Sequence, residues 1–272
     1  MVRSLWSGAT GMNAQQTNVD TIANNLANVN SVGYKAQVAQ FKSLLYQNLQ
    51  SITTTANGDP KPTTSQVGLG VRTSSINQIF RQGSLLDADS DTAFAIEGDG
   101  FFAVRGDDNQ IFYTRNGDFT WAIGVGNRMT LTNADGLPVL NTEGRAIIVP
   151  AGMVASNLSI TEDGQICYPD ERNNPQPIGE QIGTFQFNNP NGLRRVGDTL
   201  FEVTDASGRV INEATNDDVD RSRIIQGYLE GSNVQVANEM VNLIVAQRAY
   251  EMNSKSITTS DSMLEVANNL KR

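Results

Sequence analysis

The chain has 272 residues, long enough to bury a sizeable core in one large domain or two smaller ones. Its net charge is −9, and no basic cluster interleaved with aromatic residues occurs, which argues against a nucleic-acid partner. Histidine is absent and Cys167 is the only cysteine, so the commonest general base and clustered zinc ligands are missing. We therefore expect no enzyme activity, no metal site and no cofactor.

The N-terminal region shows no membrane-targeting signal. Residues 1–16 interleave Ser, Gly, Asn and Gln with few apolar residues, unlike the continuous apolar region of a cleavable signal peptide. Elsewhere no apolar stretch is long enough to span a bilayer. We expect no direct membrane insertion, and by itself this pattern indicates a cytoplasmic protein.

Residues 1–29 are predicted to form a helix. Apolar residues recur there at seven-residue intervals and make a narrow stripe, with two further apolar positions beside it: Leu5, Met12, Val19 and Leu26, then Ile22 and Val29. Uncharged Asn and Gln residues fill the spaces between them. Gly33 follows, and we expect it to adopt a left-handed backbone conformation that ends the helix or forms a turn.

Residues 30–70 are predicted to be an extended connector. The part from residue 47 onward is rich in Thr, Ser, Gln, Gly and Pro, with an Asn57-Gly58 turn and the stiffening prolines Pro60 and Pro62. The region from 71 to 225 then changes to short β-type runs separated by turn dipeptides such as Asp135-Gly136 and Asp163-Gly164. This texture predicts an antiparallel β domain.

Residues 226–272 are predicted to carry a second long helix. Its apolar residues again lie seven apart, at Val236, Leu243, Tyr250, Ile257 and Leu264, supported by Met240 and Ile244. Ser232 and Gln235 fit a capping box, which places the start of the helix at residue 232 or a few residues later.

One motif resembles a metal-binding loop only in part. The run Asp87-Ala88-Asp89-Ser90-Asp91 starts like a calcium loop, but Thr92 and Gly98 stand where such a loop needs Gly and Glu. We interpret it as a solvated turn.

The two terminal stripes leave two interpretations open. In one, both helices are ordinary core helices that cover the β domain. In the other, the narrow stripes and amide-rich flanks serve contacts with several neighbouring copies, and a head-to-tail contact that does not close would give a helical filament.

Motifs at both chain ends resemble those of bacterial flagellar rod and hook proteins. They comprise Asn24, Asn25, Leu26, Ala27 and Asn28, then Gly33, Tyr34 and Lys35, and near the other end Gln247, Arg248 and Tyr250. Within that family the opening residues, Tyr46, Gln47 and the insertion before Gly68 resemble the distal rod members. A proximal rod protein and a non-flagellar β-domain binding module with helical arms remain alternatives.

The resemblance implies an α+β fold in which the two terminal helices pair as an antiparallel coiled coil. It also implies a hollow, rigid rod in the periplasm that transmits torque from motor to hook and conducts exported subunits. The implied partners are further copies of the chain, proximal rod and hook proteins, surrounding ring proteins and the flagellar export apparatus. Export would then proceed without a cleavable signal peptide. In such a rod the Asn and Gln side chains, including Gln15 and Asn24, are expected to face the channel.

Overall fold

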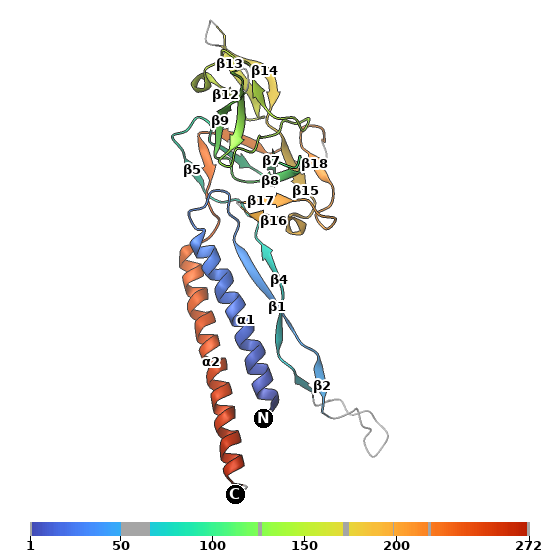
Figure 1. Cartoon of the computed structure of the whole chain (residues 1–272), viewed down its shortest axis with the longest axis vertical. Helices are drawn as coiled ribbons and strands as arrows, with labels where there is room; N and C mark the ends of the chain where they lie inside the picture. The colour runs from blue at the N-terminus through green and yellow to red at the C-terminus, as the bar shows by residue number, and fades with distance from the viewer. Residues whose placement is uncertain are drawn as a thin grey trace. The chain divides into compact units, whose positions relative to one another are not determined.

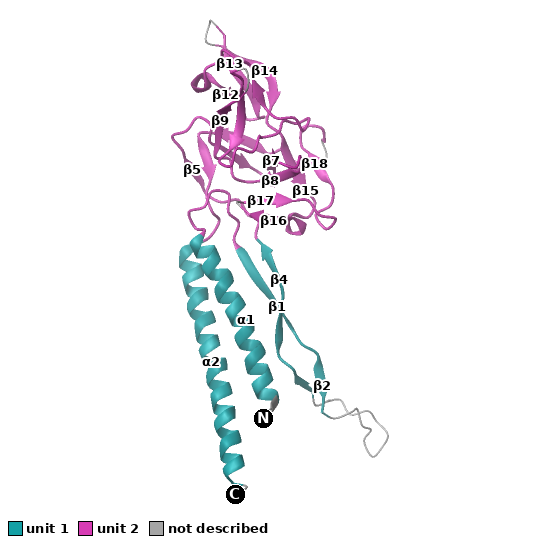
Figure 2. Cartoon of the chain, viewed as in Figure 1, with its two compact units in different colours: residues 1–27, 37–78, 235–272 teal, residues 28–36, 79–234 magenta. Residues whose placement is uncertain are grey.

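A computed structural model describes residues 2–49, 66–124, 127–170, 174–197, 199–216 and 219–270. The chain divides into two compact units (Figure 2). Unit 1 comprises residues 1–27, 37–78 and 235–272, and unit 2 comprises residues 28–36 and 79–234.

Unit 1 contains both terminal helices, α1 (Val2–Ala27) and α2 (Val236–Asn269). They lie side by side and run in opposite directions (Figure 1). No glycine or proline interrupts α2, which favours one long helix. It begins at Val236 rather than Ser232, and its N-cap residue, Gln235, makes no side-chain capping bond. The Ser232 hydroxyl instead accepts a hydrogen bond from the Val234 amide (3.3 Å), so the expected capping box is absent.

Unit 1 also contains a long antiparallel hairpin, where the sequence suggested an extended connector. Strand β1 (Gln37–Ser43) pairs with β4 (Val71–Gln78), and β2 (Tyr46–Asn48) pairs with β3 (Gln66–Gly68). Along β1 the side chains of Gln37, Ala39 and Phe41 are less exposed than their neighbours, and α1 packs against both β1 and β4. The connector prediction was wrong here because these strands are rich in Gln, Ser and Thr, so their alternation of apolar and polar residues is weak.

Unit 2 is built almost entirely of short strands, and the strand pairs among its described residues are antiparallel. A six-stranded sheet in the order β16-β17-β8-β7-β15-β18 forms its centre. Two three-stranded sheets, β11-β10-β9 and β12-β13-β14, and the pairs β19-β6 and β20-β5 complete the unit. The strands are β5 (Leu85–Asp87), β6 (Phe94–Glu97), β7 (Phe101–Arg105), β8 (Ile111–Thr114), β9 (Phe119–Ile123), β10 (Met129–Asn133), β11 (Ile148–Val149), β12 (Ser159–Ile160), β13 (Gln165–Pro169), β14 (Pro175–Gln181), β15 (Thr184–Phe187), β16 (Arg194–Gly197), β17 (Leu200–Glu202), β18 (Val210–Asn212), β19 (Arg223–Gln226) and β20 (Tyr228–Glu230). Two single-turn 3-10 helices, Ala155–Asn157 and Pro190–Gly192, lie in its loops.

The core of unit 2 consists of two apolar clusters. The larger one joins aliphatic side chains with Phe94, Phe102 and Phe119, and the smaller one is mainly aromatic. In the smaller cluster Phe101 packs edge-on against Phe187 and Phe201, with ring centroids 5.5 and 6.0 Å apart. Such edge-to-face contacts add specific geometry to the burial of apolar area.

The observed boundaries differ from the expected division at 29, 70 and 225. Residues 71–78 belong to the hairpin of unit 1, because their backbone pairs with β1. Residues 28–36 and 226–234, which flank the two helices in sequence, belong to unit 2. Their hydrogen bonds to each other and to the β domain explain this assignment, as described below.

Candidate functional site

The contact between α1 and α2 is made by small and polar residues. The hydroxyl oxygens of Ser4 and Ser260 lie 3.1 Å apart. A Cβ atom added at Gly8 would lie 2.8 Å from the side chain of Ile257, and one added at Gly11 would lie 2.8 Å from that of Asn253. Glycine at these two positions therefore allows the helices to approach closely.

This seam is only partly the one that the seven-residue spacing predicted. Ile22 is buried, and Leu5, Met12, Val19, Leu26, Leu243, Ile257 and Leu264 are half-buried. By contrast, Val236, Met240, Ile244 and Tyr250 are exposed, and Ala246 and Ser260 are the buried residues of α2. The spacing predicted that these four residues contact helices of this chain or of neighbouring copies, and their contacts with other copies stay a prediction. Small side chains line much of the contact and Ile257 packs over Gly8, while several larger apolar groups point away.

Five of the exposed apolar residues of α2 lie in its first third. Val236, Met240, Val241, Ile244 and Val245 are each at least 41% exposed. Val236, Met240 and Ile244 lie four residues apart and therefore on one side of the helix. Val241 and Val245, also four apart, lie on the neighbouring side. A shallow pocket beside Val19 and Tyr250, also lined by Gln16, Gln247 and Glu251, continues between the two helices. An apolar surface of this kind on a chain of this size marks a site for a partner.

Asn25 fixes the end of α1 within unit 1. It is 1% exposed, and its side-chain amide donates to the Gln37 carbonyl and accepts from the Gln37 amide, both at 2.8 Å. The same amide nitrogen lies 3.4 Å from a carboxylate oxygen of Glu239 in α2. One asparagine of the family motif thus links α1, β1 and α2, whereas Asn24 lies on the exposed side of α1.

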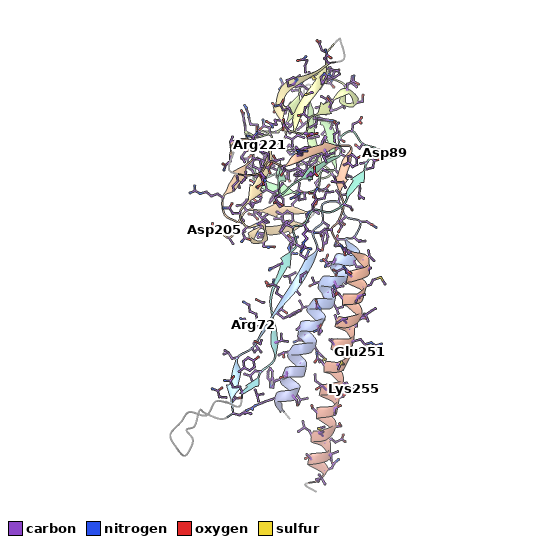
Figure 3. All side chains as sticks on the ribbon, turned by 180° about the vertical axis from the view of Figure 1, so that it is seen from behind. Arg72, Asp89, Asp205, Arg221, Glu251 and Lys255 are labelled. Carbon is purple, nitrogen blue, oxygen red and sulfur yellow. The ribbon has the colours of Figure 1, made fainter. Side chains whose placement is uncertain are left out.

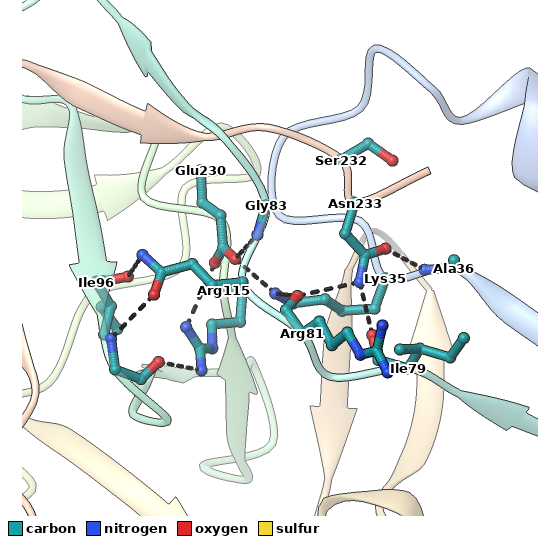
Figure 4. Close-up of polar contacts among 12 residues, drawn as sticks. Lys35, Ala36, Ile79, Arg81, Gly83, Ile96, Arg115, Glu230, Ser232 and Asn233 are labelled. Carbon is teal, nitrogen blue, oxygen red and sulfur yellow. Dashed lines mark hydrogen bonds and ion pairs between the residues drawn. The ribbon is translucent and has the colours of Figure 1, made fainter. Parts of the chain in front are cut away.

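One further motif residue, Lys35, belongs to a polar junction in unit 2 (Figure 4). We define this junction as the buried residues Lys35, Arg115 and Glu230 with Asn233. Lys35 Nζ lies 2.5 Å from one Glu230 carboxylate oxygen and donates to the Arg81 carbonyl at 2.9 Å. Arg115 lies 3.4 Å from the second oxygen. The Gly83 amide also donates to Glu230, at 2.8 Å.

Asn233 holds the backbone around this ion cluster. Its side-chain oxygen accepts from the Ala36 amide (2.7 Å), and its nitrogen donates to the carbonyls of Ile79 (2.7 Å) and Arg81 (3.0 Å). One asparagine therefore connects the segments 28–36, 79–84 and 229–234. The buried side chains of Tyr34, Ala36 and Val234, with Val29 beside them, pack into a small apolar cluster.

Gly33 has the left-handed conformation that the sequence predicted, with φ +69°. Its amide donates to the Glu230 carbonyl at 2.7 Å. A Cβ atom here would lie 2.6 Å from the Asn116 amide nitrogen, so the backbones pack too closely for any larger residue.

Burial shapes the electrostatics of the junction. It lowers the pKa of Lys35 below its usual range, an effect that the nearby Glu230 carboxylate opposes. It also lowers the pKa of Arg115, again against Glu230. The Arg115 guanidinium lies 5.0 Å from the Phe101 ring centre and donates to the Gly98 carbonyl at 2.7 Å. Glu230 thus pairs with two buried cations, and the carboxylates of Asp99 and Glu213 also favour the charged form of Arg115.

No pattern in the sequence indicated Arg115 or Glu230 as site residues. Each is one charge in a short strand segment, and they meet only through the fold. Of the predicted connector residues, Tyr46 and Gln47 lie in β2 and are exposed, while Asn57, Gly58, Pro60 and Pro62 lie outside the described residues. Gln247 and Arg248 are exposed on α2, where Arg248 pairs with Glu251 at 2.9 Å.

The described residues contain neither a candidate membrane helix nor a metal-binding cluster. None of the helices found there is long and apolar enough to cross a membrane. In the same part of the chain, no group of three or more His, Cys, Asp or Glu side chains could hold a metal ion.

Three family patterns match separate parts of the chain, near its two ends and in its middle. They are described as flagella basal body rod protein (residues 5–35), flagellar hook protein FlgE/F/G D1 domain (95–168) and flagellar basal body rod FlgEFG protein C-terminal (225–270). The chain is 42% identical to the flagellar basal-body rod protein FlgG of Borreliella burgdorferi, over all of both chains. It is 39% identical to that of Agrobacterium fabrum, over 99% of this chain and all of the relative. The FlgG protein of Bacillus subtilis is 36% identical over both full lengths.

Proposed function

Because the chain belongs to the flagellar basal-body rod protein family and is a structural subunit rather than an enzyme, we propose that it polymerises into the distal segment of the rod. The polymer would be a hollow, rigid shaft that transmits torque from the motor to the hook and conducts exported subunits. The observation that carries this proposal is the exposed apolar surface of α2. An isolated subunit would leave this surface in water, and a neighbouring copy would cover it.

In this proposal α1 and α2 form an antiparallel coiled coil that lines the tube. The small residues of the seam, among them Gly8 and Gly11, allow one chain's helices to pack closely. Large residues such as Met240 and Ile244 are then available for helices of other copies. Uncharged side chains, including that of the exposed Asn24, would face the channel and give exported chains few strong contacts.

The hairpin of unit 1 would bridge neighbouring copies and stiffen the shaft. Its exposed apolar residues, Leu45, Tyr46 and Leu49, support a contact outside the subunit. Unit 2 would form the outer wall, where its acidic surface could turn within surrounding ring proteins. Further partners of the assembled chain would be the proximal rod and hook proteins.

We place the assembled chain in the periplasm, delivered by the flagellar export apparatus without a cleavable signal peptide. The α1–α2 contact buries few large apolar side chains, so an isolated pair gains little from packing. The terminal helices would therefore be largely unfolded in the free subunit and would fold on assembly. Circular dichroism of a dilute monomer tests this, and full helicity would contradict it.

Electron microscopy of the concentrated, purified protein tests polymerisation. We expect tubular rods for the natural chain and a marked loss of rods when Met240→Ser and Ile244→Ser are combined. A matched control, Ile123→Ser with Val154→Ser, replaces two exposed apolar residues of unit 2 and should still form rods. Monodisperse particles from the natural chain at all concentrations would contradict the proposal.

A further inference from the structure

The described part of the hairpin carries only two charged residues, and both are basic. Residues 37–49 and 66–78 contain Lys42 and Arg72 and no acidic residue. The two lie directly opposite each other in the β1–β4 register, so their side chains share one face. Like charges at such positions repel each other and destabilise a strand pair. The hairpin therefore accepts an unfavourable contact that its own strands do not relieve.

No acidic side chain of the subunit compensates this pair in the described structure. Both residues are exposed, and neither takes part in the ion pairs found among the described residues. Figure 3 shows Arg72 on the hairpin strand. A doubly positive, solvent-exposed face on a bridging element favours an acidic partner surface.

Unit 2 of the same chain supplies acidic surface in excess. It contains 12 basic and 23 acidic residues, a net charge of −11, whereas unit 1 contains 8 basic and 6 acidic residues, a net charge of +2. Several of these acids already have a basic neighbour: Glu143 pairs with Arg145 and Glu202 with Arg194, and Glu162 lies 4.0 Å from Arg223. The partner of the basic pair should therefore be an acidic group without such a neighbour.

The segment Asp87–Asp91 meets this requirement. Its three carboxylates are exposed, and none of them takes part in the ion pairs of the described residues. Figure 3 labels Asp89 at the surface of unit 2. The backbone is held in place, since the Ala88 amide donates to the Gly227 carbonyl (2.9 Å) and Gln226 donates to the Asp91 carbonyl (2.7 Å). Because this backbone is held, the segment loses less conformational entropy on binding.

We propose that Lys42 and Arg72 of one copy bind the Asp87–Asp91 segment of a neighbouring copy in the polymer. This inference rests on the proposed self-assembly and names one of its contacts. The contact pairs the basic hairpin face with the acidic face of unit 2, so it fixes which copies the hairpin joins. Because both groups are exposed, the contact weakens as salt screens it.

Charge reversal in the full-length protein tests the contact. The measured quantity is the critical concentration for rod formation, by sedimentation and electron microscopy. We expect it to rise about tenfold for Lys42→Glu with Arg72→Glu, from the loss of two exposed ion pairs and the new repulsion. Asp89→Lys with Asp91→Lys should have a similar effect, and combining all four substitutions should restore assembly. The matched control, Arg128→Glu with Arg209→Glu, changes the net charge equally at two exposed arginines of unit 2.

The outcomes separate this inference from the proposed function. If the natural chain forms rods and the Lys42→Glu, Arg72→Glu variant assembles equally well, the proposed contact is wrong and the proposed rod function is unaffected. A four-substitution chain no better than either double variant would overturn the pairing with Asp87–Asp91. Failure of the natural chain to form rods would instead contradict the proposed function. Circular dichroism of each variant monomer verifies that unit 2 remains folded.

Discussion

Lys35 and Glu230 are 195 positions apart in the chain, yet their side chains form a fully buried ion pair with Nζ and Oε1 at 2.5 Å. Lys35 follows the first helix in sequence and Glu230 precedes the second. Arg115, from the end of β8, approaches the same carboxylate. The pair thus connects the two segments of unit 2 that flank the terminal helices to the β domain. Substituting one charged residue at a time measures how much each contributes to the stability of unit 2.

The two partners should respond unequally to substitution. Glu230→Gln removes the ion-pair partner of two buried cations and should destabilise unit 2 by about 3–5 kcal/mol. Lys35→Met leaves the Arg115–Glu230 pair intact and should cost clearly less. Urea unfolding of the full chain, followed by Trp121 fluorescence in a Trp6→Phe background, measures both. Equal losses for the two variants would show that Arg115 does not compensate Glu230.

Tyr113 makes the stability of unit 2 sensitive to high pH. Its ring packs between Phe185 and Phe187, and burial raises the pKa of its hydroxyl from 10.0 to about 12. Between these values the unfolded chain releases a proton that the folded chain retains. The contribution of the protonated Tyr113 hydroxyl to the stability of unit 2 is therefore fully present below pH 10. This contribution, about 2–3 kcal/mol, is lost as the pH rises through about 12.

Tyr113→Phe should remove this part of the pH dependence. We expect the difference in unfolding free energy between natural and Tyr113→Phe chains to be constant up to pH 10 and to shift in favour of phenylalanine above it. Urea titrations at several pH values measure this difference, because the other ionisable groups are common to both chains. If the difference in unfolding free energy stays constant up to pH 12, burial does not raise the pKa of the Tyr113 hydroxyl.

The antiparallel register of the helix pair predicts a specific cross-link. The hydroxyls of Ser4 and Ser260 are close enough that cysteines in their places should form a disulfide. Ser4→Cys with Ser256→Cys is the matched control, since Ser256 is exposed one turn away on α2. In assembled rods, gel electrophoresis without reductant should show an intramolecular bond for the first pair only. Equal cross-linking of both pairs would contradict the register.

The helices could be predicted from the sequence, but their contact could not. A seven-residue apolar spacing located both helices, because it reflects the periodicity of the helix itself. The contact instead uses Ser4, Gly8, Gly11 and Ala246, small residues that no hydrophobic pattern distinguishes. The exposure of Met240 and Ile244 depends on the partner helix, which a single-chain pattern does not specify.

In unit 2, too, features set by neighbouring residues in the sequence could be predicted, and contacts between distant residues could not. The left-handed Gly33 was predicted, because a glycine after a helix has a local meaning. The Lys35–Arg115–Glu230 cluster was not, because single charges in separate strands carry no sign of their partners. The hairpin was mistaken for a connector, since its polar strands are stabilised by α1 rather than by their own apolar alternation.

The hairpin should control the curvature of the assembled rod. Strands β1 and β4 remain paired up to Ser43 and Val71, and the Leu44 amide donates to the Gly70 carbonyl at 2.9 Å. Deleting about residues 47–64 therefore disrupts the β2–β3 pair and leaves the β1–β4 pair intact. Without the bridging contact, neighbouring copies can slide, and we expect curved filaments in electron micrographs. Replacing the same residues with a Gly/Ser segment of equal length distinguishes the effect of chain length from that of specific contacts. Straight filaments from both variants would show that this segment does not stiffen the shaft.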